Sequence, residues 1–450
     1  MGRSYPFLFF VGFLPKLFGF FLALACAATP VFAYTTHGSL STRYRFRTAE
    51  GVSDQDIETV GSAEFGDAFS DRVTGSVQVG GVFNVDGRKN TGPFADVYGG
   101  FNSAAVERIY HAYVDVKEAG PFEKFRAGRQ YRYEFESLHY DGATLQTGSA
   151  AGLSVTAFGG IPVHLFENRL GHQTGDWMAG GALQFDPAPW ARFRFDMVHL
   201  RDKGSGFRAN FGDQEDTLFG TSLWFDLDPN VMVSTRFTAF SDQVRDLRTE
   251  VRMLVPDQKL TIENRFYTLL KPQGIRAIDF DAYGFIGSYE PFFEVMTTVT
   301  KGFGEHFFVD LGYMGRFLRD TQIGSAFNHG YQRGFVTVST AGFPLEGMSL
   351  SATGDYFHGT DSTFKNNLFS ASFAADQEVW QRRMRLSGGT AFYLYRYNLF
   401  TGNESEDVRT YFARVSMKIL ESLDGRVGYE FEQDSLANFH TVDTRVVWKF

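Results

Sequence analysis

The sequence predicts an all-β fold: a transmembrane antiparallel β-barrel of about 20–22 strands, with 16–18 left open and no plug domain. Three observations support this prediction. Segments of about ten residues alternate apolar and polar side chains, with turn residues between them. The 450 residues include 50 Phe, 20 Tyr and 48 Gly but only 13 Pro. After the N-terminal segment, no stretch approaches the ~18 consecutive apolar residues of a membrane helix, so a chain in a membrane must span it as a closed sheet.

Residues 1–33 have the pattern of a signal peptide, and residues 34–450 are expected to form a single barrel domain. Small side chains at the end of the segment predict cleavage between Ala33 and Tyr34. The single cysteine, Cys26, lies within this segment, and whether it carries a lipid stays open. The mature chain would then hold no cysteine, which excludes disulfides and Cys-x-x-Cys-His haem attachment.

The alternation is clearest in the segments 71–85, 190–200, 247–253 and 411–419. Within 190–200, the side chains of Phe193, Phe195 and Met197 point to one face. Those of Arg192, Arg194 and Asp196 point to the other face. One apolar and one charged face with a period of two is typical of a strand that lies between lipid and water.

Short and long connections alternate between the predicted strands. Short ones carry turn residues, as in Asp228-Pro229-Asn230 and Ser422-Leu423-Asp424-Gly425. The longest, 86–103, is too short to form a plug. Counting back from Phe450, this alternation requires a weak strand over 55–66. It also requires one long strand over 282–301, although that strand would contain Pro291.

The last strand ends in an aromatic residue. Val442, Thr444, Val446 and Trp448 share one face, which Phe450 extends. This ending resembles the terminal signal of bacterial outer-membrane β-barrels. The resemblance implies that Trp448 and Phe450 form an assembly signal that the barrel-assembly machinery reads. It also implies a location in the outer membrane of a Gram-negative bacterium, in contact with its lipid.

A second resemblance covers about 20 residues near the start of the predicted barrel. Ala112-Tyr113-Val114-Asp115-Val116, a short turn and Phe125-Arg126-Ala127-Gly128-Arg129-Gln130 resemble a strand pair of bacterial porins. The resemblance implies a channel rather than an enzyme, and it carries no particular solute with it.

Many arginines occupy the polar face of the predicted strands. Rings of arginine in a pore favour anions. Alternatively, these charges pair with carboxylates on neighbouring strands and only stiffen the wall. The predicted lumen-lining arginines are Arg43, Arg45, Arg192, Arg194, Arg236, Arg248, Arg252, Arg265, Arg414 and Arg445.

No catalytic or metal-binding pattern stands out, and no cofactor is expected. The chain has neither a His-x-x-x-His pair nor a Gly-x-Ser-x-Gly turn. A structural hydrogen bond between His111 and Asp115 is expected rather than a catalytic dyad. Asp54, Asp56 and Glu58 read as a solvated acidic loop. The net charge of −9 does not suggest a nucleic-acid partner.

Two functions fit these features. The first is a porin, an outer-membrane channel for small hydrophilic solutes with a mild anion preference, narrowed by inward-bent connections such as 86–103. The second is a sheath that holds a partner protein across the membrane. Barrels of porin–cytochrome conduits are of this kind, and there a multihaem cytochrome supplies the path for extracellular electron transfer.

Overall fold

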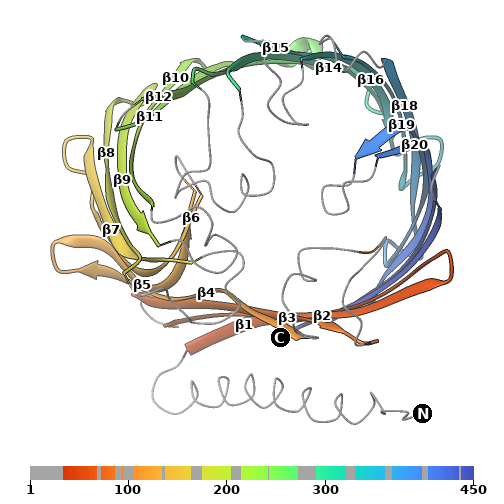
Figure 1. Cartoon of the computed structure of the whole chain (residues 1–450), viewed down its shortest axis with the longest axis horizontal. Helices are drawn as coiled ribbons and strands as arrows, with labels where there is room; N and C mark the ends of the chain where they lie inside the picture. Colours follow the sequence, from red (N-terminus) through yellow and green to blue (C-terminus); the bar gives the residue numbers. More distant parts are fainter. Residues whose placement is uncertain are drawn as a thin grey trace.

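In the computed structural model, 22 strands form one closed antiparallel barrel (Figure 1). Each strand pairs with the next, and β22 (Asn438–Lys449) pairs with β1 (Tyr34–Ala49) to close the ring. The strand number is the upper value of the predicted range, so the predicted fold class is confirmed. The structure describes residues 34–67, 72–86, 94, 105–133, 137–163, 175–203, 214–241, 243–271, 290–319, 330–359, 367–397, 404–434 and 437–450.

The other strands follow one another around the ring, and a turn of 3-10 helix, Pro256–Gln258, lies between β12 and β13. They are β2 (Val52–Asp67), β3 (Val73–Asn84), β4 (Ala105–Ala119), β5 (Phe122–Arg132), β6 (Leu138–Thr147), β7 (Leu153–Pro162), β8 (Trp177–Ala188), β9 (Ala191–Asp202), β10 (Gln214–Asp228), β11 (Val231–Phe240), β12 (Val244–Val255), β13 (Leu260–Leu269), β14 (Phe292–Phe303), β15 (Phe307–Leu318), β16 (Tyr331–Ala341), β17 (Met348–Gly359), β18 (Asn367–Val379), β19 (Met384–Tyr397), β20 (Glu404–Leu420) and β21 (Leu423–Gln433).

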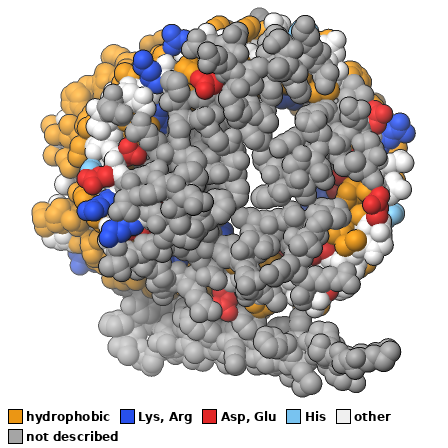
Figure 2. Space-filling view, viewed as in Figure 1, with side chains coloured by type: hydrophobic (Ala, Val, Ile, Leu, Met, Phe, Trp, Pro, Cys, Tyr) orange, Lys and Arg blue, Asp and Glu red, His pale blue; other side chains and the backbone are white. Residues whose placement is uncertain are grey.

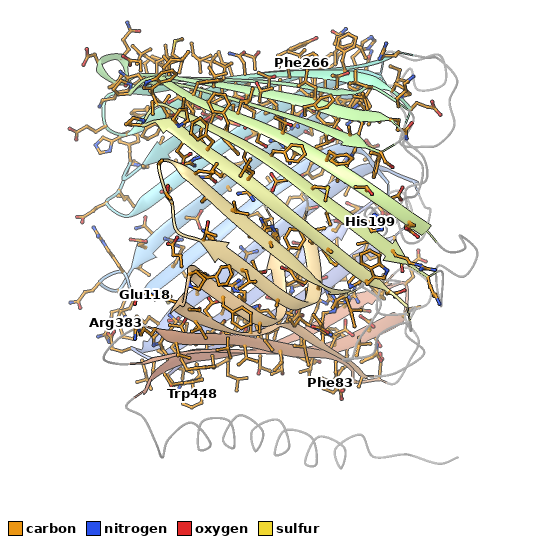
Figure 3. All side chains as sticks on the ribbon, turned by 90° about the vertical axis from the view of Figure 1, so that its left-hand side faces the viewer. Phe83, Glu118, His199, Phe266, Arg383 and Trp448 are labelled. Carbon is orange, nitrogen blue, oxygen red and sulfur yellow. The ribbon has the colours of Figure 1, made fainter. Side chains whose placement is uncertain are left out.

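The two rims of the barrel differ. One rim holds short connections, such as those between β8 and β9 and between β10 and β11, and the end of β22. The other rim holds the longest connections, 85–104 and 270–291. Figure 3 shows Glu118 and Arg383 at the first rim and His199 at the second. Within the described ranges, no helix has the length and hydropathy needed to cross a membrane.

Two expected elements differ from the sequence prediction, whereas the weak strand over 55–66 is present as part of β2. The expected single strand over 282–301 is wrong at Glu290 and Pro291, which lie outside a strand, because β14 begins at Phe292. Residues 282–289 lie outside the described residues. Proline has no N–H to donate to a strand ladder, so pairing starts beyond it. The turn expected over 422–425 is shorter, since β21 already begins at Leu423.

The outer face of the barrel is apolar. On β9, Phe195 and Met197 are exposed, whereas Asp196 between them is buried on the opposite face. Exposed Val, Leu, Phe and Tyr side chains recur on alternate positions of most strands. Figure 2 shows hydrophobic side chains along the outside of the ring. Such an outer surface is stable in lipid and would be unfavourable in water.

The barrel closes at its last residue. The register of β1 and β22 runs from Ala49↔Phe439 to Ser39↔Lys449. Beyond it, the Gly38 N–H donates to the Phe450 carbonyl (2.9 Å) and the Phe450 N–H donates to the Gly38 carbonyl (3.1 Å). A Cβ at position 38 would collide with the Ser62 backbone carbonyl oxygen as well as with the Phe450 ring, so glycine is required there. Phe450 therefore extends the closing seam.

Deleting Phe450 is expected to lower the amount of folded barrel much more than the stability of the barrel that does fold. The deletion removes one exposed aromatic side chain, which contributes at most about 1.5–3 kcal/mol, and two backbone hydrogen bonds to Gly38 at the rim, where water can replace them. The resemblance, in contrast, gives this residue a role in assembly. The measurement is the fraction of heat-modifiable, folded protein in the outer membrane. Trp380→Ala, which removes another exposed aromatic, serves as the control. A deletion strain with the normal amount of folded protein would contradict the prediction.

Candidate functional site

The candidate site is the inner wall of the barrel. Along each strand, charged and polar side chains alternate with the apolar residues of the outer face, so they point to the enclosed side. Arg194 and Asp196 show this on β9: three hydrogen bonds of 2.9–3.0 Å join them on the face opposite Phe195. Any solute that entered the barrel would meet this charged surface.

The acidic segment at the start of β2 belongs to this wall. Asp54 and Asp56 are each only 4% exposed. Arg45 donates to Asp56 (2.8 Å) and Arg47 donates to Asp54 (2.9 Å), because the β1–β2 register places these residues opposite each other. The expectation of a solvated acidic loop is therefore wrong. The arginines of β1 neutralise the two carboxylates within the wall.

Carboxylates hold at least six of the ten arginines that the sequence places on the lumen face. Besides Arg45 and Arg194, Arg192 contacts Asp186 at 3.1 Å and Arg252 contacts Glu263 at 3.2 Å. The remaining two pairs are Arg43 with Asp443 and Arg248 with Glu250. Four of these six arginines pair with carboxylates on neighbouring strands, as the alternative expected. Arg194 and Arg248 instead pair along their own strands.

The other four arginines have different surroundings. Arg265 lies 3.1 Å from the Met296 sulfur, Arg414 lies over the Phe412 ring at 5.6 Å, and Arg236 faces Arg248 in the β11–β12 register. Arg445 donates to the Ser41 hydroxyl at 2.8 Å.

Arg445 also belongs to a row of like charges. Arg426 on β21 lies directly opposite it in the register on one side, and Arg43 on β1 lies opposite it on the other side. Asp443 contacts Arg43 and lies 3.9 Å from Arg426. We call Arg426, Arg445 and Arg43 the arginine row. Like charges placed directly opposite each other destabilise a sheet. A contribution to the stability of the barrel therefore does not explain the arginine row.

The pairing of β4 with β5 stops early. Its register runs from Ala119↔Phe122 to Ala112↔Arg129 and, within the described segment 105–132, goes no further. Beyond this point, two β4 carbonyl groups accept hydrogen bonds from side chains instead of from the β5 backbone. Arg129 donates to the Ile109 carbonyl (3.4 Å), and His139 Nε2 donates to the Tyr110 carbonyl (2.9 Å). No feature of the sequence pattern indicated this break in the wall.

A buried ion pair lies at the break. Arg129 donates two hydrogen bonds to Asp141, of 2.7 and 2.6 Å, and its side chain is only 2% exposed. Both charges are therefore largely removed from solvent, and each depends on the other.

The expected hydrogen bond between His111 and Asp115 does not form. His111 Nε2 is 2.8 Å from the Ser76 hydroxyl, and Asp115 accepts two hydrogen bonds from Arg126, of 2.7 and 2.8 Å. Arg126 is the better partner because it lies opposite Asp115 on β5. Among the residues that the structure describes, no group of three or more His, Cys, Asp or Glu side chains is placed to hold a metal ion.

One described residue of a long connection reaches the wall. Phe94, between β3 and β4, is 5% exposed. The Arg47 guanidinium lies over its ring at 5.1 Å, and the Phe439 ring meets it edge-on at 6.1 Å. Since Arg47 and Phe439 lie on the inner face of β1 and β22, the connection turns inward at this residue.

No family model matches the chain, and a search of curated proteins finds no match. Solved structures share its fold. The P pilus usher (PapC) translocation pore has a TM-score of 0.53 and 9% identity, over 92% of this chain and 99% of that one. The ferric enterobactin receptor PfeA of Pseudomonas aeruginosa has a TM-score of 0.56 and 10% identity, over 94% and 82%. OccAB4 of Acinetobacter baumannii has a TM-score of only 0.44 and 10% identity, over 94% and 99%.

These identities establish a likeness of fold alone. Together with the closed ring of 22 strands and the apolar outer face, the likeness defines the class: the protein is an outer-membrane β-barrel. Its place is the outer membrane of a Gram-negative bacterium, where the outer face contacts lipid.

Asp141→Ala is expected to destabilise the barrel by about 3–5 kcal/mol, because it leaves the buried Arg129 guanidinium without its carboxylate. Glu118→Ala is the matched control. It breaks the exposed pair of Arg72 and Glu118, which contributes about 0–1 kcal/mol. Denaturant unfolding of both variants in detergent or lipid measures the difference. Equal stabilities would show that the Arg129–Asp141 pair is not buried as described.

Proposed function

We propose that the protein is a channel that passes small hydrophilic solutes across the outer membrane, with a mild preference for anions. One observation carries the proposal: a closed wall of 22 strands whose inner face is charged and polar. Barrels of 16–18 strands already leave an aqueous channel, and this one is wider. Within the described ranges, no folded domain occupies the enclosed space. The proposal assigns the protein no chemical reaction.

The arginine row supports the anion preference. Arg445 donates to a hydroxyl group and not to a carboxylate, and it lies between two other arginines. Rings of arginine attract anions and repel cations. The preference is mild because carboxylates neutralise at least six of the ten predicted arginines, so most of the wall adds little net charge.

In a planar lipid bilayer, the purified barrel is expected to conduct with a large unit conductance and a mild anion preference. Arg445→Gln should move the reversal potential in a KCl gradient towards zero, because it removes one charge from the arginine row. Arg72→Gln removes the same charge from an exposed position at the short-connection rim and should leave the potential unchanged. Clear cation selectivity of the unsubstituted barrel would refute the anion preference.

The width of the barrel also favours a second candidate function, a sheath around a partner protein. Barrels of 22 strands in outer-membrane transporters hold a plug, and an open lumen of this width would leak periplasmic solutes. A multihaem cytochrome would be such a partner, as in porin–cytochrome conduits, a family with which the sequence is compatible although no motif demands it. A partner enclosed by the wall should survive extraction in mild detergent, and native mass spectrometry would detect it. A barrel that is extracted alone and conducts freely would rule out the sheath.

A further inference from the structure

A pocket lies in the inner wall over strands β5 to β9. Its volume is about 480 Å³, within the ~300–1,000 Å³ of small-molecule sites. Most of its side chains come from the inner face of β5 to β9. The lining residues are Lys124, Arg126, Gln130, Tyr131, Arg132, Tyr133, Tyr140, Thr144, Gln146, Ser154, Thr156, Ala182, Gln184 and Arg194.

Hydrogen bonds fix one side of the pocket. The Tyr140 hydroxyl donates to Thr144 Oγ1 (2.6 Å), and the Thr144 hydroxyl donates to Gln130 Oε1 (2.9 Å). The Gln130 amide donates to the Gly142 carbonyl (3.1 Å). Tyr140 is fully buried and Gln130 is 2% exposed. A connected chain of buried, satisfied polar groups rigidifies its surroundings, so this side of the pocket is preorganised.

The pocket is basic. Lys124, Arg126, Arg132 and Arg194 line it, and no carboxylate is among the lining residues. Asp196 neutralises Arg194, so the excess charge comes from the other side of the pocket. Lys124 and Arg126 both form ion pairs with Asp115, at 3.1 and 2.7 Å, and Asp115 itself is not part of the lining. Two cations sharing one carboxylate leave an excess of positive charge at this corner. An anionic group in the pocket would be bound by charge-assisted hydrogen bonds.

The rest of the lining suits hydroxyl groups. Gln146, Gln184, Ser154 and Thr156 carry amides and hydroxyls, which both donate and accept hydrogen bonds. The Tyr133 side chain is mostly exposed and stacks on Tyr131 at 5.6 Å, so an aromatic surface is available to the C–H face of a sugar ring. An anion without hydroxyl groups would leave these polar side chains unused.

We propose that this pocket binds a sugar that carries one anionic group, such as a hexose phosphate or a hexuronate. The inference rests on the proposed channel function, since it names the class of solute that the wall binds during passage. The basic corner at Lys124 and Arg126 would hold the anion, and the amide and hydroxyl side chains would hold the sugar.

Isothermal titration calorimetry of the full barrel in detergent tests the proposal without requiring a current. Glucose 6-phosphate is expected to bind at least tenfold more tightly than glucose or inorganic phosphate. Lys124→Gln should weaken glucose 6-phosphate about tenfold, the effect of losing one hydrogen bond to a charged group. This variant keeps the Arg126–Asp115 pair, so the wall stays intact. Lys418→Gln removes a lysine from β20, outside the pocket, and should change nothing.

A second variant tests recognition of the sugar. Gln146→Leu should weaken glucose 6-phosphate severalfold and leave the weak binding of inorganic phosphate unchanged. Equal affinity for glucose 6-phosphate in the Lys124→Gln and Lys418→Gln variants would overturn the proposed site. Inorganic phosphate that binds as tightly as glucose 6-phosphate would overturn the sugar specificity. Conduction without binding refutes the pocket alone, and binding without conduction refutes the channel alone.

Discussion

Closure of the sheet is the constraint on which the rest of the structure depends. In hydrocarbon, each unpaired backbone N–H or C=O costs several kcal/mol, so the sheet must not have a free edge. The pairing of β1 with β22 meets this requirement, and the reciprocal bonds between Gly38 and Phe450 extend it to the last residue. At the break between β4 and β5, Arg129 and His139 donate hydrogen bonds to two β4 carbonyl groups, in place of the neighbouring strand.

Closure also decides which residues can contribute to function. Once the ring is closed, alternate side chains point either to lipid or to the lumen. Most charged residues take the inner face, and their neighbours in the register determine whether they remain available. Arg45 faces Asp56 and is neutralised, whereas Arg445 faces two arginines. The proposed anion preference therefore follows from the register rather than from the number of arginines.

The alternation in the sequence predicted the closed barrel, a range of strand numbers whose upper value is the observed one, and the short and long connections. These features depend only on a period of two and on turn residues. Features that depend on a partner strand were not predictable. Asp54 and Asp56 look like a solvated loop until β1 supplies Arg45 and Arg47. The bond expected between His111 and Asp115 is lost to Ser76 and Arg126. The pocket gathers side chains from five neighbouring strands, β5 to β9, which no local pattern encodes.

The central claim is that alternate residues of each strand face water inside and lipid outside. The chain contains one cysteine, Cys26, in the predicted signal peptide, so introduced cysteines can be labelled against a low background. Ser416 lies opposite Arg426 on the inner face, and Val415 beside it is 42% exposed on the outer face. A charged, water-soluble maleimide applied to the membrane-embedded barrel should label Ser416→Cys and not Val415→Cys, with the unsubstituted protein as control. Labelling of Val415→Cys with protection of Ser416→Cys would contradict the account.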